Sequence, residues 1–238
     1  MRYVTEALIL KTTKYGDTSV VVQAYTRLLG LIAFMARGVR KKRAKIPVAL
    51  LQPMNLTQIV FSSAKTGTLG HLNEISLTTI YQTIPFDAKK NAILVFINEI
   101  LYKSLKEEQP HETLFDYIKN FLVALDEDQG HFSNNHLFFM AGLTQYFGIS
   151  PNFEKKGWFD LREGVLVSPK PLHEYATSNE ETVLFQMLFS TPPEKQCRIK
   201  INASDRNILL NMLLKYYALH IPGMETIRSR SVLHQIFH

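Results

Sequence analysis

Cysteine is almost absent from the 238-residue chain, which contains only Cys197. A single thiol excludes an intramolecular disulfide framework and a zinc site built from several cysteines, and it suits a reducing compartment. Long apolar runs are also absent, because no stretch approaches the roughly 18 residues of a membrane span. The first residues, MRYVTEALILKTTKYG, lack the layout of a signal peptide. We therefore expect a cytoplasmic protein that does not enter a membrane.

The sequence motifs of common enzymes are missing as well. No glycine-rich loop matches a nucleotide-binding pattern, no Gly-x-Ser-x-Gly elbow occurs, and Cys197 has no histidine partner signature. The acidic run 126–128 has the composition of a metal-binding cluster, but it falls where a helix should end and is more typical of a solvated turn. We expect no catalytic residue, no cofactor and no metal, so the chain is predicted not to be an enzyme.

Acidic residues are scarce in the first third of the chain. Residues 1–80 carry eleven Lys and Arg against three Asp and Glu, whereas residues 81–238 carry sixteen against eighteen. The net charge of +6 therefore divides into +8 and −2. Six basic residues share one short stretch: Arg37, Arg40, Lys41, Lys42, Arg43 and Lys45. Such a cluster attracts polyanions in a salt-dependent way. The alternative interpretation is a solvated, mobile loop tip with no partner.

Short strands separated by turn residues predict a small β domain. The strand patterns cover residues 4–10, 19–26, 31–36, 56–61 and 68–75. Five strands at this spacing are typical of a small closed barrel, which places the basic stretch in the loop between the third and fourth strands. Barrels of this kind bind single-stranded nucleic acid by neutralising its backbone and stacking its bases on aromatic rings. The rings available are Tyr3, Tyr15, Tyr25, Phe34 and Phe61, most of which we expect in the core.

Helical periodicity replaces the strand pattern after residue 80. Apolar residues recur at spacings of three and four over residues 91–105, 114–125 and 137–147. Gly148 fits the C-cap of the third helix. Residues 148–177 lose the periodicity and are predicted to form a loop insertion.

Two further helices and a hairpin are expected beyond the third helix. The hairpin pairs residues 158–161 with 165–167 inside the insertion. Ser178 and Glu181 have the spacing of a capping box for a helix that runs through Phe189. Ser204 is expected to cap the next helix.

Several short motifs carry a resemblance to one protein family. They are Ala7-Leu8-Ile9-Leu10, Tyr15-Gly16-Asp17-Thr18, Tyr25-Thr26 leading to Gly30, Ala36-Arg37-Gly38-Val39-Arg40, Leu51-Gln52-Pro53, Leu72-Asn73-Glu74 and the terminal Arg228-Ser229-Arg230. The identity and order of these motifs resemble those of the bacterial recombination-mediator family RecO, a family of DNA repair factors. The order covers essentially the whole chain, and the motifs are specific in residues 1–80.

The resemblance implies an α+β protein. Residues 1–80 would form an antiparallel five-stranded oligonucleotide/oligosaccharide-binding barrel (OB-fold), and residues 81–238 a mainly helical domain with the insertion at 148–177. It also implies binding of single- and double-stranded DNA without sequence specificity, annealing of complementary strands, and assistance to recombinase loading on strands coated by single-strand-binding protein. The implied partners are DNA, RecR, the acidic C-terminal tail of single-strand-binding protein and, indirectly, the recombinase RecA. The implied location is the bacterial cytoplasm, at the nucleoid.

Basic side chains of the barrel are the expected DNA-binding residues. They are Arg37, Arg40, Lys41, Lys42, Arg43 and Lys45, helped by Lys11, Lys14 and Arg27. Neutralised phosphates repel each other less, so two strands can be held close together whatever their sequence. The presence of Lys11, Lys14 and Arg27 in the barrel is explained equally well by solvated positions at the ends of strands.

The expected insertion departs from the family in one respect. Many RecO proteins carry a four-cysteine zinc site there, but residues 151–172 contain no cysteine. Four thiolate ligands cannot be supplied, so no structural zinc is expected. Phe153, Trp158, Phe159 and Leu166 are candidates for an apolar substitute.

A protein-interaction scaffold is the competing interpretation. In that case the helical domain is the working surface, and the basic barrel binds RNA or an acidic protein. A scaffold should bind its partner and leave the rate of strand annealing unchanged, whereas a mediator should accelerate annealing. A hydrolase is disfavoured because the residue constellations that it needs are missing.

Overall fold

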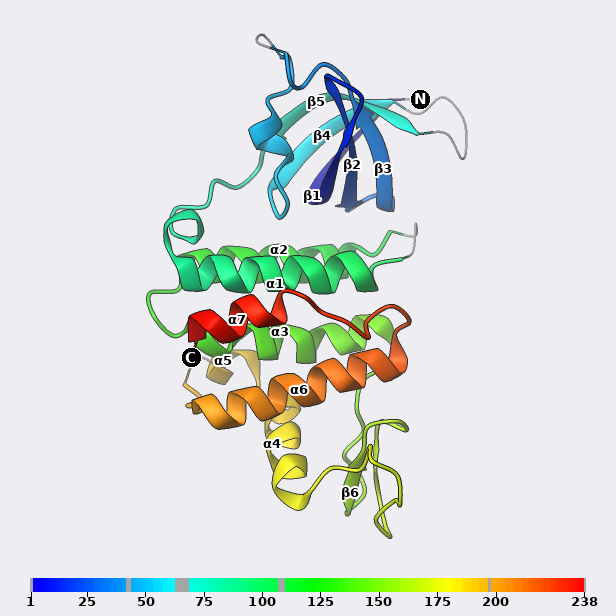
Figure 1. Ribbon diagram of the computed structural model, residues 1–238, viewed down its shortest axis with the longest axis vertical. Helices are drawn as coiled ribbons and strands as arrows, with labels where there is room; N and C mark the ends of the chain where they lie inside the picture. The colour runs from blue at the N-terminus through cyan, green and yellow to red at the C-terminus, as the bar shows by residue number, and fades with distance from the viewer. Residues whose placement is uncertain (1, 42–43, 63–68, 107–109, 197, 238) are drawn as a thin grey trace. The chain divides into compact units, whose positions relative to one another are not determined.

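Five strands close into a barrel at the start of the chain (Figure 1). They are β1 (Arg2–Tyr15), β2 (Ser19–Thr26), β3 (Gly30–Ala36), β4 (Leu56–Ser62) and β5 (Gly70–Leu77). The strand order is β1-β2-β3-β5-β4. Every neighbouring pair is antiparallel except β3 and β5, which are parallel and close the barrel. The predicted five-stranded barrel is therefore confirmed, with one parallel pair that the strand patterns did not indicate.

The structure is a computed structural model that describes residues 2–41, 44–62, 69–106, 110–196 and 198–237. Lys42, Arg43 and Cys197 lie outside the described residues. The chain forms two units, of which the first contains Met1–Pro85 and Leu101–Asp126 and the second contains Phe86–Ile100 and Glu127–His238. Within the described ranges, no helix is both long and apolar enough to cross a membrane.

The barrel core follows from the alternation of side chains along each strand. Val20, Val22 and Ala24 on β2 point inward and meet Phe34 of β3 and Phe61 of β4. Tyr25, Phe34 and Phe61 are 4% exposed or less, whereas Tyr15 is 58% exposed. The expectation that most of the aromatic residues would belong to the core is confirmed for these three.

Strand β1 is longer than the apolar pattern of residues 4–10 predicted. Ile9 is in register with Ala24 but Lys11 with Gln23, so Leu10 is an extra residue in a β-bulge. The bulge resets the register, and the polar residues that follow continue to pair with β2 as far as Tyr15. Lys11 therefore lies within a strand rather than in a segment after it.

Helix α2 (Glu112–Glu127) packs on the barrel within the first unit. Arg27 follows β2 and forms ion pairs with Glu6 at 3.2 Å, Asp116 at 2.8 Å and Glu112 at 3.4 Å. Lys119 of α2 pairs with the other carboxylate oxygen of Glu6. The Tyr25 and Phe115 rings stack at 6.3 Å nearby. Charges from two distant parts of the sequence thus neutralise each other at this contact.

Asp126 is buried, which overturns the interpretation of residues 126–128 as a solvated turn. Its side chain is near the end of α2 and accepts hydrogen bonds from the backbone N–H groups of Gln82, Thr83 and Ile84 at 2.7, 2.9 and 2.8 Å. These groups open the short 3-10 helix η2 (Ile84–Phe86), whose first N–H groups need acceptors. The sequence pattern missed this role because the cap comes from a residue more than forty positions away.

The second unit is helical. Helices α3 (Asn135–Leu143), α4 (Asn179–Ser190) and α6 (Ala203–His220) pack on one another. Helix α1 (Ala88–Ser104) begins in this unit and ends in the first. The shorter elements are η1 (Val48–Leu51) in the first unit and η3 (Phe132–Asn134), η4 (Thr144–Phe147), α5 (Pro193–Gln196) and α7 (Arg230–Phe237) in the second.

Helix caps in the second unit confirm two predictions and correct a third. Gly148 has a φ of 67° at the C-cap of η4, and Ser178 and Glu181 form the predicted capping box of α4. The cap of α6 is Asn202 and not Ser204, because the Asn202 side chain accepts from the backbone N–H of Asp205 at 2.8 Å. Both residue types are good N-caps, so composition alone did not distinguish them.

Aromatic packing holds the insertion after η4. Strands β6 (Trp158–Asp160) and β7 (Val165–Val167) form the predicted hairpin. Phe159 is fully buried, with its ring 5.1 Å from those of Phe153 and Phe185. Leu166 is buried as well, whereas Trp158 is only half-buried. Across the described ranges, no group of three His, Cys, Asp or Glu residues is placed to hold a metal ion.

The terminal Arg228-Ser229-Arg230 motif is attached to α1 through Glu99. The Glu99 carboxylate accepts hydrogen bonds from the Arg228 N–H at 3.0 Å and from the Ser229 N–H and hydroxyl at 2.7 and 2.6 Å. Ser229 is buried, while the side chains of Arg228 and Arg230 are exposed. The motif therefore holds the start of α7 in place within the second unit.

Candidate nucleic-acid interface

The candidate site lies where β3 and β5 separate after a short contact. These two strands pair at only two described positions, Phe34 with Gly70 and Met35 with His71. Gly70 allows the close approach, because a Cβ there would lie 3.3 Å from the Ser62 carbonyl oxygen and 3.4 Å from the Phe61 ring. Beyond this seam the strands diverge, and the barrel wall opens into a pocket.

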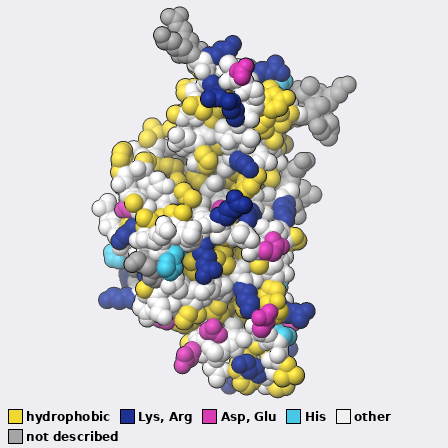
Figure 2. Space-filling view, in the orientation of Figure 1, with side chains coloured by type: hydrophobic (Ala, Val, Ile, Leu, Met, Phe, Trp, Pro, Cys, Tyr) yellow, Lys and Arg dark blue, Asp and Glu magenta, His cyan; other side chains and the backbone are white. Residues whose placement is uncertain are grey.

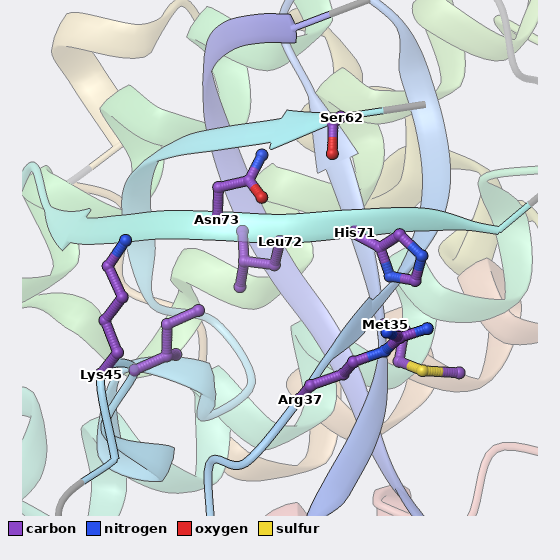
Figure 3. Close-up of a pocket in the computed structure, with 8 residues that line it drawn as sticks. Met35, Arg37, Lys45, Ser62, His71, Leu72 and Asn73 are labelled. Carbon is purple, nitrogen blue, oxygen red and sulfur yellow. The ribbon is translucent and has the colours of Figure 1, made fainter. Parts of the chain in front are cut away.

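The pocket has a volume of about 400 Å³, which lies in the usual range of about 300–1,000 Å³ for small-ligand sites. Its lining residues come from the end of β3, the following loop, the end of β4 and the start of β5; they are Met35, Arg37, Lys45, Ile46, Ser62, His71, Leu72 and Asn73. Figure 3 shows His71 and Arg37 extending toward one another from the two separating segments.

A second β-bulge presents polar side chains of β5 to the pocket. Val60 is in register with Glu74 but Phe61 with Leu72, so Asn73 is the extra residue. Leu72 is buried in the barrel core, while His71 and Asn73 on either side of it are half-buried. Three consecutive residues of one strand therefore all line the pocket, which regular alternation would not allow.

The basic stretch after β3 is anchored on the barrel at both ends. Val39 and Ile46 are 3% and 5% exposed and belong to the barrel core. Gly38 turns the chain with a φ of 69°, and the Arg40 N–H donates to the Thr18 carbonyl at 3.4 Å. Exposed Arg37, Arg40, Lys41 and Lys45 thus project from a loop whose ends are packed.

Glu74 is an acidic residue at the edge of the pocket. Its carboxylate pairs with Arg2 at 3.1 Å and lies 4.0 Å from the Lys45 ammonium group. All three side chains are more than half exposed, so the pairs are weak and a stronger anion can replace Glu74. Figure 2 shows one face of the barrel, where dark blue Lys and Arg side chains are more frequent than magenta Asp and Glu side chains.

The three helper residues from the sequence analysis have different surroundings. Lys14 is exposed on β1, in register with Val20, which is itself in register with Ala36 next to Arg37. Lys11 donates to the Tyr102 hydroxyl at 3.0 Å and lies over its ring. Arg27 follows the opposite end of β2, in its cluster of three carboxylates. The structure therefore groups Lys14 with the basic loop and separates Arg27 from it.

Sequence analysis missed Met35, Ser62, His71 and Asn73. None of them is a cation, and His71 was not counted among the aromatic residues. The only available signal was the Leu72-Asn73-Glu74 motif, which lies in the strand that carries them. Their role in one pocket depends on the pairing of β3 with β5, between residues that are 36 positions apart in the sequence.

Comparisons with known proteins agree along the whole chain. The family model for the N-terminal part of recombination protein O matches residues 1–81, and the model for its C-terminal part matches residues 85–230. The DNA repair protein RecO of Christiangramia forsetii is 33% identical, and that of Phocaeicola vulgatus is 30% identical, with 98% of both chains covered in each case. The RecO of Flavobacterium psychrophilum is 29% identical over the full length of both chains. The chain belongs to the RecO family.

Family membership confirms two expectations. RecO proteins function in DNA repair and recombination, and they are mediators and not enzymes. The prediction that this chain is not an enzyme is therefore confirmed.

Proposed function

We propose that this RecO family member binds single- and double-stranded DNA without sequence preference and anneals complementary strands. The binding surface is the basic face, which we define as Lys14, Arg37, Arg40, Lys41 and Lys45 together with the neighbouring Lys42 and Arg43. One observation supports this most strongly: the described loop residues project from an anchored loop beside a pocket of about 400 Å³. Arg27 is omitted because three carboxylates surround it.

Charge neutralisation explains how such a surface would promote annealing. Each Lys or Arg that contacts a phosphate releases condensed counterions, which favours binding at low salt. Two strands on the same basic face repel each other less than in water, and base pairing then supplies the sequence specificity. Phosphate contacts of this kind carry no sequence information, which suits a protein that must anneal any strand.

Family membership supports further partners for the proposed mediator. We propose that the chain interacts with RecR and with the acidic tail of single-strand-binding protein, and that it assists loading of the recombinase RecA on coated strands. These interactions would occur at the bacterial nucleoid in the cytoplasm. The residues that would contact these proteins are not assigned.

Salt-dependent DNA binding tests the basic face directly. We expect the triple variant Arg37→Ala/Arg40→Ala/Lys41→Ala to bind single-stranded DNA more weakly than the wild type. The slope of log K against log salt should become shallower by about 2, because each lost phosphate contact removes about 0.7 from the slope for single strands. Annealing of complementary oligonucleotides should slow in parallel. Fluorescence anisotropy over a salt series and a strand-annealing assay measure the two effects.

A matched control removes the same charge elsewhere. Lys170, Lys195 and Lys200 are exposed in the second unit, and their replacement by Ala should leave the slope unchanged. An unchanged slope in the barrel variant would refute the basic face. Normal partner binding together with annealing rates that do not respond to the wild-type protein would support the scaffold interpretation instead.

A further inference from the structure

We propose that the pocket between β3 and β5 holds one unstacked base of single-stranded DNA. This inference rests on the proposed DNA binding and adds to it a contact with a base, where the basic face alone contacts only phosphates. The pocket would then distinguish the substrate of annealing, a single strand, from its product, a duplex.

The apolar part of the pocket suits the face of a base. Ile46 and Leu72 are 5% and 6% exposed, and Met35 is half-buried beside them. Met35 offers the accessible apolar surface, with the edges of Ile46 and Leu72 beside it, and its polarisable thioether can contact any of the four bases because every base has a π-face. Contact of this kind does not select a sequence.

The polar part of the pocket suits the edge of a base. The Nδ1 atom of His71 is buried and has no hydrogen-bond partner among the described residues. A buried polar atom of this type is costly unless a ligand or water satisfies it. Asn73 and Ser62 line the same cavity, so an amide and a hydroxyl are available beside the imidazole. Each of the three side chains carries groups that can pair with the donors and acceptors of an unpaired base.

The space beside its ring distinguishes the half-buried His71 from the buried His136. His136 in the second unit also has an Nδ1 atom without a partner among the described residues. The cavity beside His136 has a volume of only about 10 Å³, too small for more than a water molecule. The pocket at His71 is about 400 Å³ and opens on the basic face.

Arg37 and Lys45 place positive charge beside the same pocket. Both side chains are exposed and line it, one after β3 and the other before Ile46. A strand whose base enters the pocket would therefore carry its flanking phosphates past two cations. A base within a duplex is stacked and paired on its edge, so it cannot enter without being flipped. Pairing of the captured strand would consequently remove the base contact and favour release of the duplex.

Removal of the bases from the DNA tests the proposal without any change to the protein. We compare a labelled thymidine homo-oligomer with an abasic strand that has the same number of phosphates. The wild type should bind the thymidine strand about tenfold more tightly, which corresponds to about 1.4 kcal/mol of contact with one base. Fluorescence anisotropy at a single low salt concentration gives both dissociation constants.

Variants of His71 assign the effect to the pocket. His71→Ala should lose the preference for the thymidine strand and bind the abasic strand as the wild type does, with an unchanged salt slope. His71→Asn should retain part of the preference, because an amide can still pair with the edge of a base. The matched control is His131→Ala, at an exposed position in the second unit, which should behave as the wild type. Thermal unfolding of each variant confirms that it is folded.

The outcomes separate this inference from the proposed function. Equal wild-type affinity for the thymidine and abasic strands, with a normal salt slope, would overturn the base pocket and leave the proposed DNA binding intact. No binding of either strand at low salt would refute both the base pocket and the proposed DNA binding. A His71→Ala variant whose affinity for both strands falls by the same factor would also overturn the base contact. Tighter binding of a uridine strand than of the thymidine strand would overturn the assignment to DNA.

Discussion

Glu74 lies at the edge of the pocket that Lys45 helps to line. Its carboxylate is 3.1 Å from Arg2 and 4.0 Å from Lys45. It offsets part of the positive charge there, and under the proposed function a DNA phosphate would compete with it for the same cations. Its position in the sequence, next to Asn73, gave no indication of this role because Arg2 and Lys45 are distant along the chain.

Replacement of Glu74 should strengthen DNA binding. We expect Glu74→Gln to lower the dissociation constant for single-stranded DNA about two- to fivefold at low salt, since a repulsive charge is removed and two cations are released. The gain should shrink as salt screens the interaction. Anisotropy titrations at low and high salt measure this effect. Glu194→Gln, at an exposed position in the second unit, is the control, and equal gains in both variants would contradict the argument.

Asp126 shows how a buried carboxylate can stabilise a turn. Burial alone would raise the pKa of its carboxyl group, but hydrogen bonds from the backbone of Gln82, Ile84 and Thr83 lower it overall. A carboxyl whose pKa is lower in the folded protein stabilises the fold above its ordinary value of 3.8. The stabilisation is lost as the pH falls through the lower folded value.

Loss of this charge should reduce stability in a pH-dependent way. We expect Asp126→Asn to lower the free energy of unfolding by about 1–3 kcal/mol at pH 7, because hydrogen bonds to a charged acceptor become hydrogen bonds to a neutral one. The difference from the wild type should diminish on acidification below 3.8. Urea unfolding at neutral and acidic pH measures it. The control Glu127→Gln, at a neighbouring exposed position, should change the free energy of unfolding by less than about 0.5 kcal/mol. A difference between Asp126→Asn and the wild type that grows as the pH falls would contradict the mechanism.

At the scale of elements, an apolar cluster packs the insertion of residues 148–177 against α4. Phe153, Phe159, Phe185 and Phe189 have neighbouring rings 4.9–6.3 Å apart. Two of these residues belong to the insertion and two to α4. The sequence indicated the first pair as a substitute for zinc. The second pair was not identified, because α4 was recognised by its cap and not by its contacts.

The stability of the insertion should depend on this cluster and not on a metal. We expect Phe159→Ala to destabilise the protein by about 3–5 kcal/mol, as is usual for a fully buried phenylalanine. Leu172→Ala, at a fully exposed position in the same insertion, should have little effect. Incubation of the wild type with a chelator should leave its melting temperature unchanged. Thermal and urea unfolding measure all three, and a chelator-induced fall in melting temperature would contradict the prediction of no structural zinc.

The contact of α2 with the barrel illustrates what charge counting misses. Arg27 contributes to the +8 of residues 1–80, but Glu112 and Asp116 of α2 and Glu6 of β1 surround it. Its carboxylate partners come from both sides of residue 80. A count divided at that position therefore overstates the unpaired positive charge of the barrel, whereas the side chains of Arg37 and Lys45 are exposed.

At the scale of the whole molecule, the two structural units do not follow the division of the chain at residue 80. The first unit contains residues 101–126 as well as the barrel, so α2 adds acidic side chains to the barrel unit. The boundary between the predicted domains 1–80 and 81–238 stays a prediction. The basic face is unaffected, since its described residues lie on the barrel away from Arg27 and its partners.

The sequence by itself determined the class of the protein. Strand patterns, turn residues and helical periodicity predicted a five-stranded barrel followed by helices, because alternation and helical spacing are local properties of a chain. The same is true of the basic loop, of the family motifs and of the missing cysteines, which are read directly from the residues.

Only the tertiary structure decided which residues meet. The parallel pairing of β3 with β5 brings His71 and Asn73 beside Arg37 and Lys45, and a bulge turns three consecutive residues of β5 toward one pocket. It also decided that Arg27 is paired and that Asp126 is buried. The physical reason is common to all of these: register and long-range contacts depend on how distant segments pack, and no local pattern specifies them.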